Sequence, residues 1–427
     1  MRTTLRARTA LGIATITGVA LIASGCATGG DDNGGGKGGD ITLTIATFND
    51  FGYTDALFKE YEDANPGVKI VHNRAATSND ARANFFQKLG AGSGLADVEA
   101  IEVDWLPEMM QYSNKLYDLT DKSVEGRWLD WKAAAATDAD GRLVGYGTDI
   151  GPEAICYRSD LFAEAGLPTD RAEVAKLLEG DWDTYFSVGH KYVEKTGKAW
   201  FDSAGATYQG MSNQFTNFYE KNDGTVIATT NKDVENTFRS VLTESADLSA
   251  KLGAWSDDWF GALSNGQYAT MLCPGWMLGV ISGNAKDTKG WDIADVFPGG
   301  GGNWGGSYLT VPAQGKNTEA AKKFAAWLTA PEQQIKAFQN AGTFPSQVEA
   351  YTDAALTGAV NEYFNNAPVG EILINRAKAV NPEPPFKGPK YFQINDAAQQ
   401  ALTRVEQGQQ TIDESWEQFV SEVNALG

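Results

Sequence analysis

Hydrophobic and polar residues follow two different periods near the start of the chain. Residues 41–45 alternate strictly between apolar and polar side chains, which is the period of a β-strand. Residues 54–63 instead place apolar side chains at helical spacing, and the run Asn-Pro-Gly at 65–67 ends the predicted helix. A second strand is predicted over 68–72. Strand, helix and strand in this order predict a parallel pair within an α/β sheet.

The later chain continues to alternate between strand-like and helical spacing. Further strands are predicted over 98–103 and 155–157. Further helices are predicted over 159–165, 177–194, 321–328, 395–406 and 412–423. We expect Ser159 to cap the first of these helices, and residues 329–332 (Thr-Ala-Pro-Glu) to form a capping box that opens another. No internal repeat is found, so the pattern predicts one body of mixed α/β elements.

Length and composition narrow the class of protein. The chain has 427 residues, which suggests either two lobes or one large body, and 42% hydrophobic with 21% charged residues is typical of a soluble globular protein. The formal charge of −20 argues against nucleic acid or an anionic membrane surface as a partner, because both require clustered basic residues. Only two histidines are present, so no His-based catalysis, metal site or cofactor is expected. The twelve tryptophans are about twice the usual share, and such an excess suggests ligands with flat apolar faces.

The first 39 residues have the pattern of an export and anchoring segment. Arg2, Arg6 and Arg8 precede an uncharged stretch over 9–25, which is too short for a stable spanning helix and is typical of a secretory signal. The residues Leu-Ile-Ala-Ser-Gly before Cys26 resemble a bacterial lipobox, although leucine is commoner than alanine three positions before the cysteine. The alternative is an ordinary secreted protein with a chance cysteine.

The lipobox interpretation divides this segment into two parts. Residues 1–25 form a signal peptide for the general export route, and Cys26 carries the lipid. Residues 27–39 are glycine-rich and polar, so we expect a flexible tether that leaves the body at the outer face of a membrane. The two remaining cysteines, Cys156 and Cys273, lie in apolar runs and form either a disulfide or two buried thiols.

Polar and aromatic residues follow two of the predicted strands directly. Asp50 and Phe51 come after the first strand, and Asp104 and Trp105 come after the strand over 98–103. Ligands of open α/β sheets bind outside the carboxyl ends of the strands, so these residues are candidates for a binding site. The alternative for each pair is a helix cap or a solvated loop.

Three later segments, taken in order, resemble one family. They are a Gly-Tyr-Gly-Thr-Asp-Ile-Gly-Pro-Glu run within 145–168, Gly-Gln-Tyr-Ala-Thr-Met-Leu-Cys-Pro-Gly-Trp over 266–276, and a glycine loop over 297–307 that precedes paired helices at 317–342. In this order and spacing they resemble the maltose-binding-like, family 1 extracellular solute-binding proteins of ABC importers. Over its full length the sequence is similar to the cellobiose- and cellotriose-binding lipoproteins of streptomycetes in this family.

The resemblance implies a fold, a function and a set of partners. The fold is a two-lobe, periplasmic-binding-protein-like α/β fold with a hinge and a central cleft; residues 40–151 and 307–352 build one lobe, and 152–306 and 353–427 the other. The function is capture of short β-glucans, cellobiose and cellotriose, without any reaction. The implied partners are an ABC permease pair with a cytoplasmic ATPase, and we expect the receptor itself to be a monomer.

The chemistry of a neutral sugar selects the candidate residues. Aromatic rings stack on its C–H faces, and carboxylates make charge-assisted hydrogen bonds with its hydroxyl groups. Trp276 follows a Pro-Gly turn and Trp304 lies in the glycine loop, so neither fits a helical core period. The resemblance places Trp276 at a sugar-stacking position and Glu153 at the position of a sugar-binding glutamate.

The full set of candidate ligand-binding residues combines these arguments. It comprises Asp50, Phe51, Asp104, Trp105, Asp149, Glu153, Tyr208, Trp276, Trp304, Gly306 and Ser307, with Phe392 as a further aromatic candidate. The glycines around Trp304 allow close backbone approach, but no Lys-Ser/Thr pair follows them as a nucleotide loop requires.

Three alternative functions remain open at this level. The same class of receptor could take a chito-, xylo- or malto-oligosaccharide. A lipid-anchored glycoside hydrolase would also use tryptophans and paired carboxylates, although no hydrolase motif is found. Peptide or metal binding is disfavoured because the sequence holds no cluster of His, Cys and Asp ligands.

Overall fold

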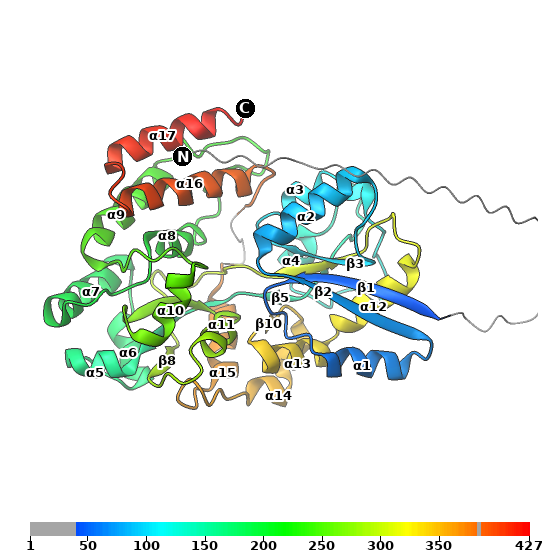
Figure 1. Cartoon of the computed structure of the whole chain (residues 1–427), viewed down its shortest axis with the longest axis horizontal. Coiled ribbons are helices and arrows are strands. Elements are labelled where there is room, and N and C mark those ends of the chain that lie inside the picture. The colour runs from blue at the N-terminus through cyan, green and yellow to red at the C-terminus, as the bar shows by residue number, and fades with distance from the viewer. Residues whose placement is uncertain (1–39, 382–385) are drawn as a thin grey trace, which may run out of the picture. The chain divides into compact units, whose positions relative to one another are not determined.

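The computed structural model describes residues 40–381 and 386–427. The predicted signal peptide, the lipobox with Cys26 and the tether all lie outside the described residues. The body from Asp40 to Gly427 is one compact unit in which the two larger sheets form the centres of two lobes (Figure 1).

A five-stranded sheet forms the centre of the first lobe. Its strands run in the order β2 (Val68–Ala75), β1 (Ile41–Phe48), β3 (Val98–Glu102), β9 (Ser307–Thr310) and β4 (Tyr146–Gly147). Strand β1 is parallel to both β2 and β3, which confirms the parallel pair predicted from the strand–helix–strand pattern. Strand β9 returns antiparallel between β3 and β4, so a late segment of the chain completes the early sheet.

Helices cover this sheet and fill its core. They are α1 (Asp55–Ala64), α2 (Ser78–Ala91), α3 (Leu106–Met110), α4 (Asp130–Ala135) and α12 (Thr318–Leu328), with short 3₁₀ turns at Ser113–Lys115 and Lys122–Val124. Helix α1 begins at Thr54, whose hydroxyl accepts a 3.2 Å hydrogen bond from the Leu57 amide. Its buried face meets Phe324 of α12 through Phe58 and Tyr61.

A three-stranded antiparallel sheet forms the centre of the second lobe. Strand β6 (Glu153–Arg158) lies between β7 (Thr270–Pro274) and β8 (Trp291–Ala294). Every residue of β6 is buried, and its side chains alternate between two cores: Ile155 points into one, and its neighbour Cys156 into the other. The sheet therefore separates two layers of helices.

The helices of these two layers come from both ends of the later chain. They are α5 (Ser159–Ala165), α6 (Arg171–Leu178), α7 (Trp182–Thr196), α8 (Ala204–Ser212), α9 (Lys232–Leu248), α10 (Asp257–Asn265), α11 (Met277–Asn284), α15 (Val369–Ala379), α16 (Tyr391–Glu406) and α17 (Ile412–Asn424). Helix α17 begins with a complete capping box between Thr411 and Glu414.

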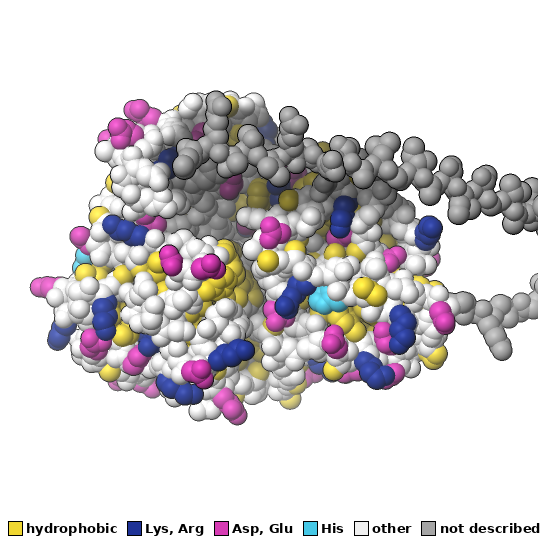
Figure 2. All heavy atoms as spheres, in the orientation of Figure 1, with side chains coloured by type: hydrophobic (Ala, Val, Ile, Leu, Met, Phe, Trp, Pro, Cys, Tyr) yellow, Lys and Arg dark blue, Asp and Glu magenta, His cyan; other side chains and the backbone are white. Residues whose placement is uncertain are grey.

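Two antiparallel segments, which we call the crossing strands, connect the lobes. They are residues 148–153 and 302–307, and backbone hydrogen bonds of 2.8–3.0 Å join them from end to end, among them Trp304 N to Gly151 O. A side chain at Gly151 would meet the Trp304 carbonyl oxygen at 1.7 Å, so only glycine allows this approach. Figure 2 shows a groove between the two lobes.

A second pairing lies beside the crossing strands. Strand β5 (Asp149–Ile150) pairs antiparallel with β10 (Phe344–Pro345), which follows α13 (Pro331–Ala341). The 3₁₀ turn Val348–Thr352 and α14 (Ala354–Thr357) come next. Helix α13 packs through Ile335 and Phe338 into the core on the α11 and α15 side of the second lobe.

Three of the predicted local features are wrong. The Ser159 hydroxyl does not cap α5; it donates to the Gly290 carbonyl at 2.9 Å instead. The predicted capping box over 329–332 is also absent, because the Thr329 hydroxyl donates to the Ala325 carbonyl within the preceding helix. The single helix predicted over 177–194 is two helices, since Gly180 adopts φ 135° and Asp181 caps a new one at Trp182.

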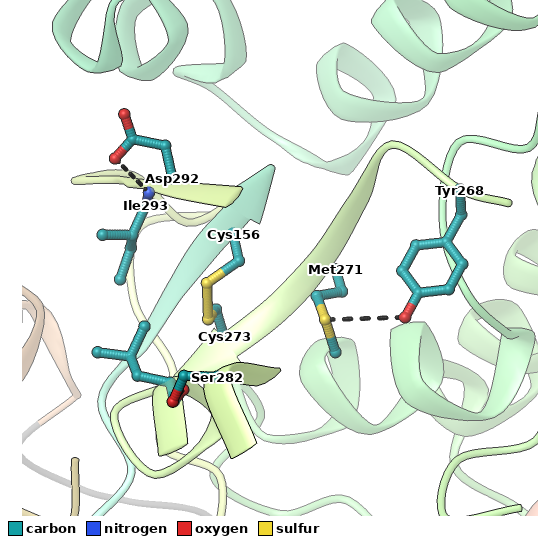
Figure 3. The surroundings of a disulfide bond; sticks show 8 residues. Cys156, Tyr268, Met271, Cys273, Ser282, Asp292 and Ile293 are labelled. Carbon is teal, nitrogen blue, oxygen red and sulfur yellow. Dashed lines mark hydrogen bonds between the residues drawn. A yellow bond between two sulfur atoms is a disulfide. The ribbon is translucent and has the colours of Figure 1, made fainter. Parts of the chain in front are cut away.

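The two cysteines left open by the sequence form a disulfide. Cys156 of β6 and Cys273 of β7 lie on adjacent antiparallel strands with their Cα atoms 5.4 Å apart (Figure 3). The bond closes a loop over a sequence separation of 117 residues and ties together the strands that carry Glu153 and lead to Trp276. It therefore fixes one wall of the groove.

Among the described residues, no helix combines the length and the apolar character needed to cross a bilayer. The same residues bring together no group of three or more His, Cys, Asp or Glu side chains that could hold a metal ion.

Candidate functional site

Trp276 and Trp304 meet where the crossing strands enter the second lobe. The Trp276 indole donates a 2.9 Å hydrogen bond to the Trp304 carbonyl, and the two rings are perpendicular with centroids 5.8 Å apart. Both side chains are half-buried. The structure thus brings together the two tryptophans that the sequence singled out.

A third tryptophan, which the sequence analysis missed, extends this pair. Trp255 lies in the loop before α10, and its ring is nearly parallel to that of Trp276 at a centroid distance of 5.8 Å. Its exposed fraction is 36%. Trp255 lies in a loop and fits no helical period, and this feature of the sequence could have identified it as a candidate.

An ion pair of low solvent exposure joins the two lobes. The Asp104 carboxylate, which follows β3 in the first lobe, binds the Lys387 ammonium just before α16 of the second. The two side chains are 16% and 9% exposed. Burial alone would lower the pKa of Lys387, but Asp104, Tyr391 and Glu102 together outweigh it and raise that pKa well above its usual range. Lys387 was not predicted, and no sequence pattern pairs it with Asp104.

Glu102 places a second carboxyl group beside Asp104, and we call these two residues the charged wall. Burial, followed by the nearby Asp104 charge, raises the pKa of Glu102 well above its ordinary value. One of its oxygens also accepts a 2.8 Å hydrogen bond from the Asp104 amide. A side chain at Gly305 would contact both Glu102 and Trp276, so the glycine loop lets the charged wall and the aromatic row approach each other.

Asp149 of the crossing strands and Lys132 of α4 are both buried, and each affects the pKa of the other. Asp149 accepts hydrogen bonds from the Thr148 hydroxyl at 2.7 Å and the Ser307 amide at 3.0 Å. Burial raises the pKa of Asp149, and the Lys132 ammonium opposes this shift. Burial lowers the pKa of Lys132 to about 8 against the influence of Asp149 and Glu102. Ser307 therefore acts in the structure as a backbone support for Asp149.

Lys132 itself lies close to the glycine loop. Its ammonium is 3.9 Å from the centre of the Tyr308 ring and makes no hydrogen bond with another described residue. Gly306, at φ 108°, leaves the space that this ammonium occupies. Neither Lys132 nor Tyr308 was predicted, because both belong to segments with an ordinary core pattern.

Glu153 is fully buried at the start of β6. Neither oxygen of its carboxyl group makes a well-formed hydrogen bond with another described residue. Burial raises the pKa of Glu153 to about 8, and the Asn213 amide and the Lys387 ammonium oppose the shift only in part. Glu153 therefore holds its proton at neutral pH, and its carboxyl group can donate one hydrogen bond as well as accept.

This raised pKa predicts the pH dependence of a Glu153→Gln variant. The folded state keeps the Glu153 proton up to a pKa of about 8, whereas the unfolded chain loses it near the ordinary value of 4.5. The stabilisation linked to this proton is complete below pH 4.5 and is lost as the pH rises through 8. Glutamine cannot ionise, so we expect the variant to be more stable than the wild type by up to about 4–5 kcal/mol at pH 9, with the difference falling below about 1 kcal/mol near pH 5.

Urea unfolding at pH 5, 7 and 9 measures this difference. Burial also raises the pKa of Glu99 to about 7 and that of Asp202 to about 6. Both residues are present in the wild type and the variant, so their contributions to the pH dependence cancel in the comparison. A difference that stays constant from pH 5 to pH 9 would show that Glu153 is ionised in the folded protein.

Asp50 and Phe51 have different surroundings although they are neighbours. Asp50 is exposed. One of its carboxylate oxygens is 3.9 Å from the Arg74 guanidinium, and the other accepts a 2.9 Å hydrogen bond from the Gly52 amide. Phe51 is buried against Phe48 and lines a small cavity of about 10 Å³ that Asp149 also lines. The structure brings Phe51 close to the crossing strands and leaves Asp50 at the surface of the first lobe.

Trp105 and Tyr208 belong to the cores, and this corrects their selection as ligand contacts. Both are fully buried. The Trp105 indole donates to the Ser78 hydroxyl at 3.0 Å, and the Tyr208 hydroxyl accepts from Tyr219 at 3.1 Å. With their polar atoms satisfied and no ring face exposed, we leave both out of the proposed site.

Phe392 connects the lobes rather than presenting its ring to the groove. The Arg82 guanidinium of α2 lies over the Phe392 ring of α16 at 4.2 Å. The same guanidinium donates to Glu108 at 2.6 Å and 2.8 Å.

A separate hollow of about 430 Å³ between α11, α13, α14 and α15 contains none of the predicted site residues.

The structure has two α/β lobes joined by crossing strands, with aromatic and charged side chains between them. This is the architecture of periplasmic-type binding proteins. The chain belongs to the family of bacterial extracellular solute-binding proteins, whose sequence model matches residues 56–363. The members of this family are exported proteins that bind solutes and are not enzymes. The predicted fold class, the family and the prediction that the chain is not an enzyme are thus confirmed.

Several related proteins are similar along nearly the whole chain. An arabino-oligosaccharide-binding protein of Bacillus subtilis is 25% identical over 389 residues, which cover 85% of this chain and 86% of the relative. The crystal structure of a family 1 extracellular solute-binding protein is 52% identical, with a TM-score of 0.81, and covers 90% of this chain and 99% of its own. A binding protein of B. animalis subsp. lactis in complex with β-1,6-galactobiose shares the fold at 21% identity, with a TM-score of 0.76 over 90% of this chain and 96% of its own.

Proposed function

We propose that this protein is a receptor for short neutral oligosaccharides, with cellobiose and cellotriose as its ligands, and that it delivers them to an ABC permease. The proposed site lies between the lobes. Its aromatic part is Trp276 and Trp304, and its polar part includes Glu153 and the charged wall of Asp104 and Glu102.

The observation that carries this proposal is the half-buried tryptophan pair beside buried carboxyl groups. Indole rings offer flat apolar surfaces that suit the C–H faces of a pyranose, and the Trp276–Trp304 hydrogen bond fixes the angle between the two surfaces. Glu153 has hydrogen-bonding capacity that no other described residue uses. A neutral sugar with several hydroxyl groups satisfies such a site without adding a net charge to an already charged wall.

The relatives support the class of ligand and provide a second candidate. Two relatives are named arabino-oligosaccharide-binding proteins, from Bacillus subtilis and Halalkalibacterium halodurans, and a third, from Rhizobium radiobacter, is named a lactose-binding protein. All three names describe neutral sugars. An arabino-oligosaccharide is therefore the second candidate ligand, while the overall likeness of the sequence favours the cello-oligosaccharides.

The proposed function also involves a membrane anchor and two functional lobes. The lipobox pattern supports a lipid on Cys26, with residues 27–39 as a tether to the outer face of the membrane. We propose residues 40–151 and 307–352 as one functional lobe, and 152–306 and 353–427 as the other. A permease pair with a cytoplasmic ATPase would take up the sugar from the closed receptor.

Isothermal titration of the purified protein with a panel of sugars tests the proposal. The panel contains cellobiose, cellotriose, arabinotriose, β-1,6-galactobiose, maltotriose and chitobiose. Saturable binding of the cello-sugars alone is expected; binding of another member instead would keep the receptor and replace its ligand. No binding to any of the six would contradict the proposed function. Recovery of every sugar intact after long incubation excludes the hydrolase alternative.

A further inference from the structure

We propose that Trp255 forms an outer aromatic platform of the ligand site and sets a preference for oligosaccharides longer than two units. This inference rests on the proposed function and goes beyond it, since the sequence patterns single out only Trp276 and Trp304. It concerns one loop, residues 249–256, which leads from α9 into α10.

The three indole rings form one continuous row. The Trp304 ring is perpendicular to the Trp276 ring, and the Trp255 ring is stacked on the Trp276 ring at an angle of 23°. Both centroid distances are 5.8 Å. A centroid distance this long between nearly parallel rings means an offset stack, in which each ring leaves part of its face uncovered. The row therefore has room for more than one sugar unit.

Trp255 is also the most accessible member of the row. Of the tryptophans in the part of the chain that the structure describes, it alone is exposed, whereas Trp276 and Trp304 are half-buried. Figure 2 shows apolar side chains gathered beside the groove on the side of the second lobe. Apolar side chains that gather into one patch beside a groove are typical of a ligand-contact surface, whereas single exposed residues are not.

Two aromatic side chains of α10 support the Trp255 indole. Trp259 and Phe260 of α10 contact its ring at centroid distances of 5.4 Å and 6.2 Å. Trp259 is anchored in turn by a 2.9 Å hydrogen bond from its indole to Asp202. The ring is thus supported by packed neighbours, while part of its surface remains free.

The backbone of Trp255 adopts a conformation that a bulky residue rarely takes. Its φ is 71°, and Lys251 in the same loop has φ 59°. Such left-handed angles are disfavoured for aromatic side chains and persist only where the surrounding structure imposes them. In this conformation the indole lies against Trp276 and keeps part of its surface exposed to solvent.

The position of Trp255 determines which ligands it affects. In this proposal a disaccharide occupies Trp276 and Trp304, on the side of the glycine loop where Glu102 lies. A third unit would extend toward the exposed end of the row and cover Trp255. The platform therefore adds affinity for a trisaccharide and leaves a disaccharide nearly unaffected.

Calorimetric titration of Trp255 variants with cellobiose, cellotriose and cellotetraose tests this inference. We expect Trp255→Ala to weaken binding of the two longer sugars about tenfold or more, the size of effect usual for a stacking aromatic residue. Cellobiose binding should change by less than about threefold, since remote truncations seldom cost more. Trp255→Asn is the second variant, because asparagine tolerates a positive φ and keeps the loop folded without the ring.

Controls separate this platform from a merely structural residue. Tyr112→Ala removes another exposed aromatic side chain, from the first lobe, and should leave all affinities unchanged. An equal loss for di- and trisaccharide in both Trp255 variants, or no loss at all, would overturn the inference. Failure of the wild-type protein to bind any neutral oligosaccharide would instead refute the proposed function, and this inference with it.

Chemical modification of the unaltered protein provides an independent measurement. N-bromosuccinimide oxidises accessible indoles, and mass spectrometry of the peptide that contains Trp255 reports the extent of oxidation. Saturating cellotriose should protect this peptide, and saturating cellobiose should not. Equal protection by both sugars would contradict the proposed role in length preference.

Discussion

Replacement of Lys387 by methionine is expected to destabilise the folded protein by about 3 kcal/mol, because it leaves the buried Asp104 carboxylate without its partner. Glu102 lies against the same charge, so the variant would concentrate two acidic groups in a region of low solvent exposure. Urea unfolding at pH 7, followed by far-ultraviolet circular dichroism, measures the loss.

Two further variants show whether the pair accounts for this loss. The double variant Lys387→Met with Asp104→Asn removes both charges and should recover a large part of the stability, since the unpaired carboxylate is then gone. Lys286→Met changes an exposed lysine and should have almost no effect. A Lys387→Met protein as stable as the wild type would show that Asp104 and Lys387 are not paired in solution.

The Asp104–Lys387 pair also has a consequence for ligand binding. It joins the first lobe to the segment before α16, so it contributes only when the lobes are close together. A ligand shifts the equilibrium between open and closed forms through contacts that differ between them. If this pair forms only on closure, weakening it lowers the apparent affinity for every sugar to the same extent.

Trp276→Ala is expected to weaken sugar binding by about 1–3 kcal/mol, because it removes the central ring of the aromatic row. The expected loss affects disaccharides and trisaccharides alike, since every proposed ligand contacts this ring. Isothermal titration with cellobiose and cellotriose measures it, and circular dichroism verifies that the variant is folded.

Trp327→Ala serves as the matched control for this variant. Trp327 is also half-buried, but it packs against Tyr61 in the first lobe, with ring centroids 5.1 Å apart. Its loss should reduce stability and leave sugar affinity unchanged. If a folded Trp276→Ala protein bound the sugars as tightly as the wild type, Trp276 would have no place in the site.

Local periodicity was sufficient for many of the helices and strands. The strict alternation at 41–45 and the helical spacing at 54–63 predicted β1 and α1 to within a few residues, because these elements depend on burial of one face. The errors fell where a side chain had two possible partners. Ser159 and Thr329 resemble caps in sequence, but the carbonyl groups of Gly290 and Ala325 are available to them in the folded chain.

The two predicted tryptophans that the structure brings together are residues that break the core pattern of the sequence. Trp276 after its turn and Trp304 in its glycine loop were identified because neither fits a buried face. Position after a strand was a weaker criterion: Asp104 follows β3 and lies between the lobes, whereas Trp105 beside it lies in the core. Sequence order alone does not decide which of two neighbours points inward.

Residues that act through long-range pairing could not be predicted. Lys387 meets Asp104 across 283 positions of sequence, and Lys132 reaches the glycine loop because Gly306 leaves space for its ammonium. Such contacts depend on the final arrangement of the sheets, which a single sequence does not specify. Trp255 was missed for a related reason, since only the fold brings its loop against Trp276.

The claim that a neutral oligosaccharide is held between the two lobes can be tested directly by hydrogen–deuterium exchange with and without the sugar that titration identifies. The account predicts slower exchange in peptides from both lobes, including those that contain Trp276 and Trp304 and those that contain Glu102 and Asp104. The crossing strands 148–153 and 302–307 should be protected as well, since closure reduces their motion. Protection confined to one lobe, or no change in exchange at saturating sugar, would contradict it.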